Sequence, residues 1–294
     1  MKSIKRGIFL IFLVFNLVNV NLFAQNNHLN FQQNIKSIES KYGGKIGIFV
    51  IDTANNKTLN YQANKRFPFC STFKFIVVGA ILNKASKNLN LLNEKISYSK
   101  ADLVNAYSPY TIKNLDNGNH SMSIKSLCKA AMLSDTTATN LLIKRLGGIE
   151  KINQFAKRAG NESFRLDRWE PYINTAIPGD SRDTSTPKDM AKIMQQLALG
   201  NQLTPKLKLT FQQWLIENNT GDQRIRAVVN KSWVVGDKTG TGDYGTTNDV
   251  AVLWPPNQKP IIISVYYTQD GKEAKANDRV IQLATKAAFN SLEH

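Results

Sequence analysis

Alternating apolar and polar positions near both ends of the chain predict β-strands. Residues 45–52 alternate toward a strand, and an Asn-Asn-Lys turn at 55–57 leads into a return strand at 58–61. The same strand character returns toward the other end in three segments, 232–236, 249–254 and 260–268. The strand-forming parts of the chain are therefore far apart in the sequence.

A helical middle separates these strands. Residues 71–84 are apolar almost all round, which predicts a helix buried on every side. Further helices are predicted at 124–133, 138–146, 151–160, 187–199 and 273–292. Residues 165–187 have little periodicity and many turn residues, and loops of that length often carry function.

The order of these elements predicts an α/β two-domain fold. The simplest packing joins the two chain ends into one antiparallel sheet flanked by helices, with the helical middle as an inserted all-helical domain. We expect a discontinuous α/β domain from residues 25–66 and 217–294, and a helical domain from residues 67–216. The active site is expected in the cleft between the two domains.

The first 24 residues have the pattern of a secretory signal. Three basic residues, Lys2, Lys5 and Arg6, precede an apolar run at 7–15, and Ala24 is a suitable cleavage position. The run is far shorter than the ~20 residues that a membrane span needs, so no stable membrane anchor is expected. We therefore expect a secreted protein, located in the periplasm.

Composition and charge narrow the classes of function. Loss of the three basic signal residues lowers the formal net charge from +16 to +13. No basic stripe interleaved with aromatic residues and no zinc finger accompanies that charge, so no nucleic-acid partner is expected. Two cysteines and three histidines leave little basis for a metal centre or a His-based catalytic triad. We expect neither a metal nor another cofactor.

Ser71 and Lys74 lie one helical turn apart in the predicted buried helix. A lysine amine at that spacing can take or relay the serine proton, and Lys74 stands in an apolar run where a charged group needs a partner. The pattern is weak by itself, because the same spacing occurs at 97–100, 126–129 and 185–188. A lysine that reaches solvent is the better interpretation of those other copies.

Two further short motifs each have a functional and a structural interpretation. The Ser-Asp-Thr sequence at 134–136 lies between two predicted helices, where it suits either an active site or a helix cap. The Lys-Thr-Gly-Thr sequence at 238–241 follows a predicted strand. Its lysine and hydroxyls can bind a substrate carboxylate beside a cleft, but an edge strand with a polar rim gives the same pattern.

Taken together, these motifs resemble the S-x-x-K, S-D-N and K-T-G signature of the penicillin-recognising serine enzymes. A fourth segment, Arg-Trp-Glu-Pro-Tyr-Ile-Asn at 168–174, resembles the R-W-E-P-x-L-N segment of class A β-lactamases, and residues 165–183 resemble their omega-type loop. The resemblance covers essentially all of the chain after the signal. It implies a monomeric enzyme that hydrolyses the β-lactam amide bond of penicillin- and cephalosporin-type antibiotics through a serine acyl-enzyme, and so confers resistance.

The resemblance also implies a role for each matching residue. Ser71 is the expected nucleophile, and Lys74 takes or relays its proton. Ser134 passes a proton to the β-lactam nitrogen, and Glu170 activates the water that releases the acyl group. The residues expected to contact the substrate or that water are Tyr107, Thr136, Asn174, Arg224, Lys238, Thr239, Gly240 and Thr241.

Several positions depart from the common pattern or mark a branch of the family. Thr136 replaces the usual asparagine with a shorter side chain that has one donor instead of two, so the substrate range is expected to differ. Arg224 is expected to share the binding of the substrate carboxylate with Lys238, because the arginine often found on the strand after K-T-G is absent. Thr241 and Cys70 occur in branches with carbapenem activity, which implies that activity here.

Both cysteines are expected to be free. In branches where Cys70 forms a disulfide, its partner stands at the position of Gly242. A family disulfide also uses a cysteine near Cys128, but its partner position lies near Val78. We therefore predict two packed thiols, with Cys128 the more buried.

Two other functions share three of the four motifs. One is a D,D-peptidase or transpeptidase of cell-wall synthesis, and the other is a penicillin sensor that stays acylated. Neither is expected to have a working equivalent of Glu170, so the segment at 168–174 favours the hydrolase.

Overall fold

The computed structural model describes residues 28–292, so the predicted signal at 1–24 lies outside the described residues. A helix at 28–42 opens this part of the chain. The other helices are α2 (Lys74–Ala85), α3 (Pro109–Asp116), α4 (Ile124–Met132), α5 (Thr136–Leu146), α6 (Ile149–Arg158), α7 (Pro187–Ala198), α8 (Pro205–Ile216) and α9 (Asp278–Leu292). No helix between residues 28 and 292 is long and apolar enough to cross a membrane.

Five antiparallel strands from both ends of the chain form the main sheet. They are β1 (Lys45–Asp52), β2 (Lys57–Tyr61), β7 (Val234–Thr241), β8 (Thr247–Trp254) and β9 (Ile261–Thr268), in the spatial order β2-β1-β9-β8-β7. The register that places Lys45 opposite Thr268 joins the two ends of the chain. Two short pairs, β3 (Phe67–Pro68) with β6 (Thr184–Ser185) and β4 (Lys95–Ser97) with β5 (Ser121–Ser123), lie outside this sheet.

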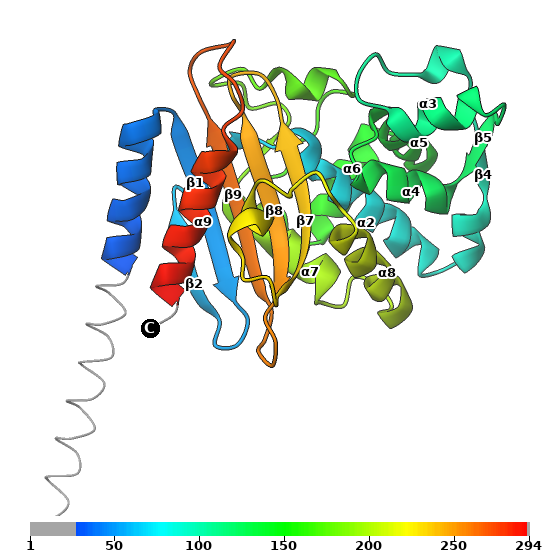
Figure 1. Ribbon diagram of the computed structural model, residues 1–294. Coiled ribbons are helices and arrows are strands. Elements are labelled where there is room, and N and C mark those ends of the chain that lie inside the picture. The colour runs from blue at the N-terminus through cyan, green and yellow to red at the C-terminus, as the bar shows by residue number, and fades with distance from the viewer. Residues whose placement is uncertain (1–27, 293–294) are drawn as a thin grey trace, which may run out of the picture.

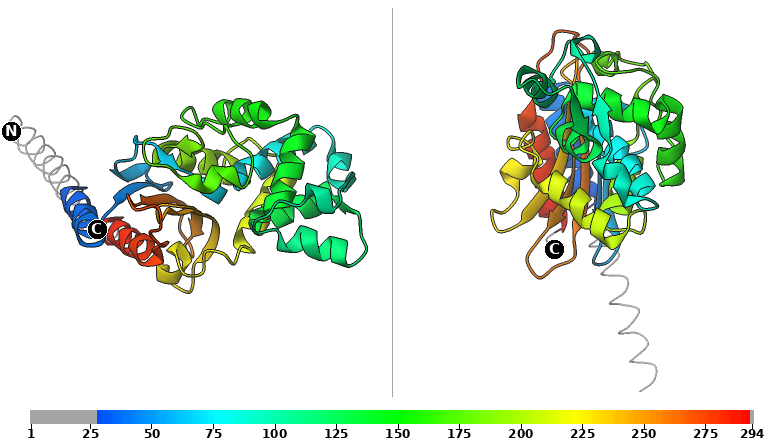
Figure 2. Two further views of the ribbon diagram at one scale, coloured as in Figure 1. Left: turned by 90° about the horizontal axis from the view of Figure 1, so that it is seen from above. Right: turned by 90° about the vertical axis from the view of Figure 1, so that its right-hand side faces the viewer.

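The sheet is buried on both faces. Successive side chains of a strand point to opposite faces, so alternate residues belong to two separate hydrophobic cores. In β1, Ile48 and Val50 belong to the cluster that also contains residues of helix 28–42 and α9. Phe49 and Ile51 belong to the cluster shared with the helical part. Figures 1 and 2 show α9 against the sheet, and α3, α4 and α5 gathered at the other end of the molecule.

Helix α2 is the centre of the helical part. Ten of its twelve residues are buried, and it contacts α4, α5, α6 and α8. Such burial explains why its sequence is apolar on all sides instead of amphipathic. The predicted α/β architecture, with a sheet from both chain ends and a helical insertion, is confirmed.

Several predicted boundaries were wrong. The buried helix starts as a 3₁₀ turn at Cys70–Phe73 and becomes α-helical only at Lys74. The strand predicted at 232–236 is Val234–Thr241, so it includes the whole Lys-Thr-Gly-Thr motif. Helices 28–42, α3 and α8 were not predicted; in α8, Leu209 is 66% exposed, which blurs the apolar stripe that would reveal the helix.

Candidate active site

A cleft of about 300 Å³ lies where the sheet meets the helical part. It is lined by Ser71, Ala106, Tyr107, Ser134, Thr136, Asn174, Thr220, Thr239, Gly240 and Thr241. Eight of the twelve predicted site residues are in this set. The other four, Lys74, Glu170, Arg224 and Lys238, are buried side chains behind the lining.

Ser71 stands on a turn that the sheet holds in place. Cys70, just before it, has a positive φ of 45°, a conformation that costs energy in a non-glycine residue and often occurs at functional sites. Asn248 of β8 donates its Nδ2 to the carbonyl oxygen of Pro68 at 2.8 Å. A Cβ on Gly240 would lie 2.6 Å from the carbonyl oxygen of Phe69, so only glycine lets β7 approach this turn.

Lys74, three residues after Ser71, forms a buried ion pair with Glu170. The Lys74 Nζ is 2.9 Å from Glu170 Oε1 and donates to the carbonyl oxygen of Ser134 at 2.9 Å. Both side chains are almost completely shielded from solvent. Glu170 therefore supplies the partner that a buried Lys74 requires, and it joins the omega-type loop to α2.

Glu170 and Asn174 form a pair of polar groups at the cleft. The Asn174 Nδ2 donates to Glu170 Oε2 at 2.7 Å. The Asn174 Oδ1 is buried and has no hydrogen-bond partner among the described residues, and Glu170 Oε1 contacts Lys74 without the alignment of a hydrogen bond. The Asn174 Oδ1, on the residue that contacts Glu170, can accept a hydrogen bond from a small donor such as water.

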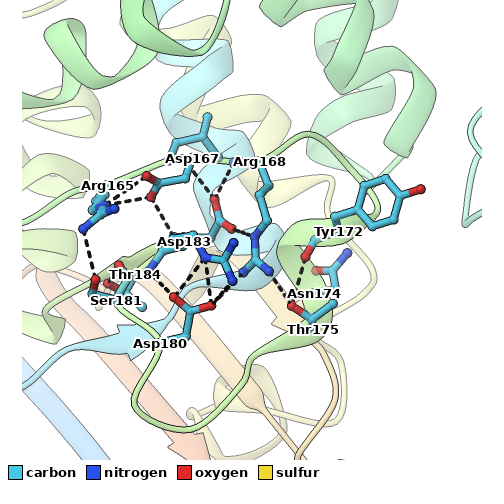
Figure 3. A network of polar contacts seen from close by, with 12 residues as sticks. Arg165, Asp167, Arg168, Tyr172, Asn174, Thr175, Asp180, Ser181, Asp183 and Thr184 are labelled. Carbon is cyan, nitrogen blue, oxygen red and sulfur yellow. Dashed lines mark hydrogen bonds and ion pairs between the residues drawn. The ribbon is translucent and has the colours of Figure 1, made fainter.

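The omega-type loop is closed by charged contacts within itself (Figure 3). Arg168 forms an ion pair with Asp183 and donates its Nη1 to Thr175 Oγ1 at 2.8 Å. The Asp183 Oδ1 accepts from the backbone N–H of Asp167 at 2.8 Å and of Arg168 at 3.0 Å. The two ends of the loop are thereby tied together, which fixes the segment that contains Glu170.

Ser134 faces the cleft at the start of α5. Its φ is 72°, and the next residue, Asp135, caps α5 by accepting from Ala138 N at 2.8 Å. Asp135 also accepts from Thr111 N of α3 at 2.9 Å. Both interpretations of the Ser-Asp-Thr motif therefore describe the structure: Asp135 is the cap, and Ser134 is a cleft residue.

Lys238 approaches Ser134 from β7. Its Nζ donates to Ser134 Oγ at 2.6 Å and to the carbonyl oxygen of Thr239 at 3.0 Å. Burial, with the nearby charge of Lys74, lowers the pKa of Lys238 to about 7. The edge strand β7 therefore also forms a wall of the cleft. The Lys238 amine lies behind the threonine hydroxyls that line this wall.

Arg224 does not line the cleft itself but contacts Thr241, which does. Only 7% of it is exposed, and its Nη2 donates to Thr241 Oγ1 at 2.6 Å. Its remaining contacts are with protein oxygens: Asp278 Oδ1 at 2.7 Å, the Gly240 carbonyl at 3.0 Å and the Asn248 carbonyl at 2.7 Å. The Arg224 guanidinium is therefore buried in the wall of the cleft, where it holds Thr241.

Known proteins resemble this chain over almost its whole length. A family model described as "Beta-lactamase enzyme family" matches residues 30–292. An imipenem-hydrolyzing β-lactamase of Enterobacter cloacae is 46% identical over 280 residues, which are 94% of each chain. The β-lactamase Toho-1 of Escherichia coli is 42% identical, with 97% of each chain covered. The chain belongs to the class A β-lactamase family.

A solved structure supports the same assignment for the fold of this β-lactamase. The crystal structure of a β-lactamase from Desulfarculus baarsii superposes with a TM-score of 0.87 at 41% identity. The match covers 91% of this chain and 98% of that one. The two proteins therefore share the same fold over almost their whole length.

Two polar residues near the β-lactamase site were not among the predicted site residues. Asn140 of α5 donates to the Glu170 carbonyl at 3.1 Å and accepts from its N–H at 3.3 Å, so it holds the backbone of Glu170 from the helical side. Thr220 lines the cleft, with its Oγ1 2.6 Å from Thr239 Oγ1. Neither residue belongs to one of the four motifs on which the sequence prediction of the site rests.

Both cysteines of this β-lactamase are free. Cys70 and Cys128 are each fully buried, so the expected difference in burial was wrong. Burial raises the pKa of both thiols, which keeps them protonated and poorly reactive. A Cβ on Gly242 would lie 2.7 Å from Cys70 Sγ, so the thiol packs against the turn that follows β7.

Proposed function

We propose that Ser71 attacks the β-lactam carbonyl and that the resulting ester is hydrolysed with the help of Glu170. The observation that carries the proposal is the buried contact between Lys74 and Glu170 beside a serine that opens onto the cleft. A serine hydroxyl is a weak nucleophile at its ordinary pKa and needs a neighbouring base. Lys74 and Glu170 are the groups near Ser71 that can serve.

In the acylation step, Ser71 Oγ forms a bond to the carbonyl carbon and the amide C–N bond breaks. The serine proton passes to the Lys74 and Glu170 pair, and the departing nitrogen takes a proton from Ser134. Lys74, which contacts Ser134 through its carbonyl oxygen, then returns a proton to Ser134. The 2.6 Å contact from Lys238 Nζ to Ser134 Oγ places a cation where negative charge would develop on Ser134. Backbone N–H groups of Ser71 and Thr241 would stabilise the carbonyl oxygen.

In the deacylation step, a water attacks the ester carbon and the bond to Ser71 Oγ breaks. Glu170 takes a proton from the water, and this proton passes to Ser71 Oγ as the ester bond breaks. The unpartnered Asn174 Oδ1 beside Glu170 supports a water position between the two side chains. This step separates a hydrolase from a protein that stays acylated.

The substrate carboxylate would be bound by the hydroxyl-rich end of β7. Thr239 and Thr241 line this part of the cleft, Lys238 lies behind Ser134, and Arg224 supports Thr241. Gly240 leaves room for the substrate to approach the strand. Tyr107, 59% exposed on the opposite wall, offers an apolar face for the rest of the substrate.

Turnover of a chromogenic cephalosporin tests the proposal. A β-lactamase gives many turnovers per molecule, a D,D-peptidase or transpeptidase gives slow turnover, and a penicillin sensor gives one burst equal to the enzyme concentration. The Lys74–Glu170 contact favours the first result. A single burst without further turnover would refute hydrolysis.

Carbapenems belong to the proposed substrate range. The Enterobacter cloacae relative is an imipenem-hydrolyzing enzyme at 46% identity. In this chain, the end of the cleft formed by β7 contains Thr241, whose hydroxyl accepts a hydrogen bond from Arg224. Loss of imipenem absorbance with the purified protein, compared with a Ser71→Ala variant, measures this activity.

We further propose that the protein is exported by its first 24 residues to the periplasm and acts there as a monomer. The cleft is lined by residues of both the proposed α/β domain (25–66 and 217–294) and the proposed helical domain (67–216). Light scattering would give the mass of one chain, and N-terminal sequencing of the exported protein would begin at Gln25. A dimeric mass or an intact N-terminus would contradict the proposal.

A further inference from the structure

A chain of hydrogen bonds connects a buried ion pair to the cleft. Asp237 of β7 is fully buried, forms an ion pair with Arg226, and accepts from Asn218 Nδ2 on its Oδ2 at 2.7 Å. The Asn218 Oδ1 accepts from Thr220 N at 3.2 Å and from Thr220 Oγ1 at 2.9 Å. The Thr220 Oγ1 then lies 2.6 Å from Thr239 Oγ1, and both threonines line the cleft.

Asp237 fixes the orientation of the Asn218 amide. Asn218 Nδ2 also faces the Asp237 carbonyl at 3.2 Å, so its donor side meets only acceptors and its amide oxygen must face Thr220. A Cβ on Gly221 would lie 2.0 Å from Asp237 Oδ2, so glycine is needed for this approach. The segment from Asn218 to Gly221 is therefore shaped around Asp237, which places the Thr220 hydroxyl at Thr239.

We propose that Thr220 is a positioning residue for Thr239 in the recognition of the substrate carboxylate, and that Asn218 holds Thr220 in place. The inference rests on the proposed β-lactam hydrolysis. Thr239 has one hydroxyl hydrogen, and when it donates this hydrogen to a carboxylate, its buried oxygen needs a donor. The Thr220 hydroxyl at 2.6 Å is that donor, while Thr220 N continues to donate to Asn218 Oδ1.

The same contacts allow a second arrangement of the hydroxyls without a carboxylate. Thr220 then donates to Asn218 Oδ1 and accepts from Thr239, so every group in the chain still has a partner. The carboxylate reverses the direction of two O–H groups and moves no heavy atom. Hydrogen bonds in such a chain polarise one another, so the donor from Thr220 strengthens the bond that Thr239 makes to the anion.

The test compares Thr220→Val with Thr220→Ser. Valine keeps the shape and removes the hydroxyl, whereas serine keeps the hydroxyl and removes the methyl group. With benzylpenicillin, Thr220→Val should raise KM about three- to tenfold with little change in kcat, the range for one lost hydrogen bond. Thr220→Ser should recover most of that loss, and Asn218→Ser should raise the same KM because it releases Thr220.

The methyl ester of benzylpenicillin separates positioning from a purely structural role. It lacks the anion, so Thr220→Val should leave its kcat/KM within about twofold of wild type, the level at which no hydrogen bond is lost. An equal loss for acid and ester, no change for the acid, or failure of Thr220→Ser to recover it would overturn the inference. If the wild-type protein hydrolyses neither compound, the proposed function fails instead, so the two failures are distinguishable.

Discussion

Replacing Arg224 with alanine should destabilise the fold as well as weaken substrate binding. The side chain is 7% exposed and donates to two buried backbone carbonyls, those of Gly240 and Asn248. A hydrogen bond to a charged group contributes about 1.5–3 kcal/mol, so the loss of these two predicts a destabilisation of roughly 3–6 kcal/mol. Its contact with Asp278 adds little, because that carboxylate is 41% exposed and can be hydrated.

Thermal unfolding measures the effect directly. At about 2–4 °C per kcal/mol for a chain of this size, Arg224→Ala should lower Tm by on the order of 10 °C. Arg145→Ala is the matched control, since Arg145 pairs with Glu94 at 2.6 Å on the surface and should cost about 1 kcal/mol or less. KM for a penicillin should also rise, because Thr241 loses its partner. A Tm within 2 °C of wild type, with only KM changed, would refute this account of Arg224.

Three further results are expected. The kcat/KM for a carboxylate-bearing penicillin should fall as the pH rises above about 7. Burial and the charge of Lys74 lower the pKa of Lys238 to that value, and the neutral amine attracts no anion. A flat pH profile would contradict this. Thr136→Asn adds a donor to the cleft and should change the ratio of kcat/KM between penicillins and carbapenems more than it changes Tm, so an unchanged ratio would show that the position is neutral. Thiol titration of the unfolded, unreduced protein should find two thiols in wild type and one in Gly242→Cys, whose new side chain starts 2.7 Å from the Cys70 sulfur; three thiols in the variant would rule out that disulfide.

The sequence predicted the architecture well where the pattern had one explanation. Strands at both ends made a joined sheet the simplest packing, and the apolar residues all round 71–84 indicated a buried helix. Boundaries failed where tertiary contacts override local preference: the turn at Cys70–Phe73 is held by β7 and β8 contacts that no local pattern contains. Helix α8 was missed because the exposed Leu209 adds an apolar residue to its solvent face, so the sequence lacks a clear apolar stripe.

The motifs also predicted which side chains meet, but not how each is used. The resemblance placed Lys74, Glu170 and Ser134 in one site, and the structure brings them together. Arg224 was expected in the carboxylate site itself, whereas its donors are taken up by protein oxygens that only the fold brings within reach. Thr220 was overlooked because its link to Thr239 joins residues 19 apart through a hydroxyl contact that leaves no periodic signal.

The most direct test of the account is the mass of Glu170→Gln after exposure to benzylpenicillin. Loss of the carboxylate removes the base for the second step and leaves Ser71 on the cleft, so one penicilloyl group per chain should accumulate, and peptide mapping should place it on Ser71. Glu162→Gln, at an exposed position, should turn over the drug and show no lasting adduct. Rapid turnover by Glu170→Gln, or an adduct on another residue, would contradict hydrolysis through a Ser71 acyl-enzyme released by Glu170.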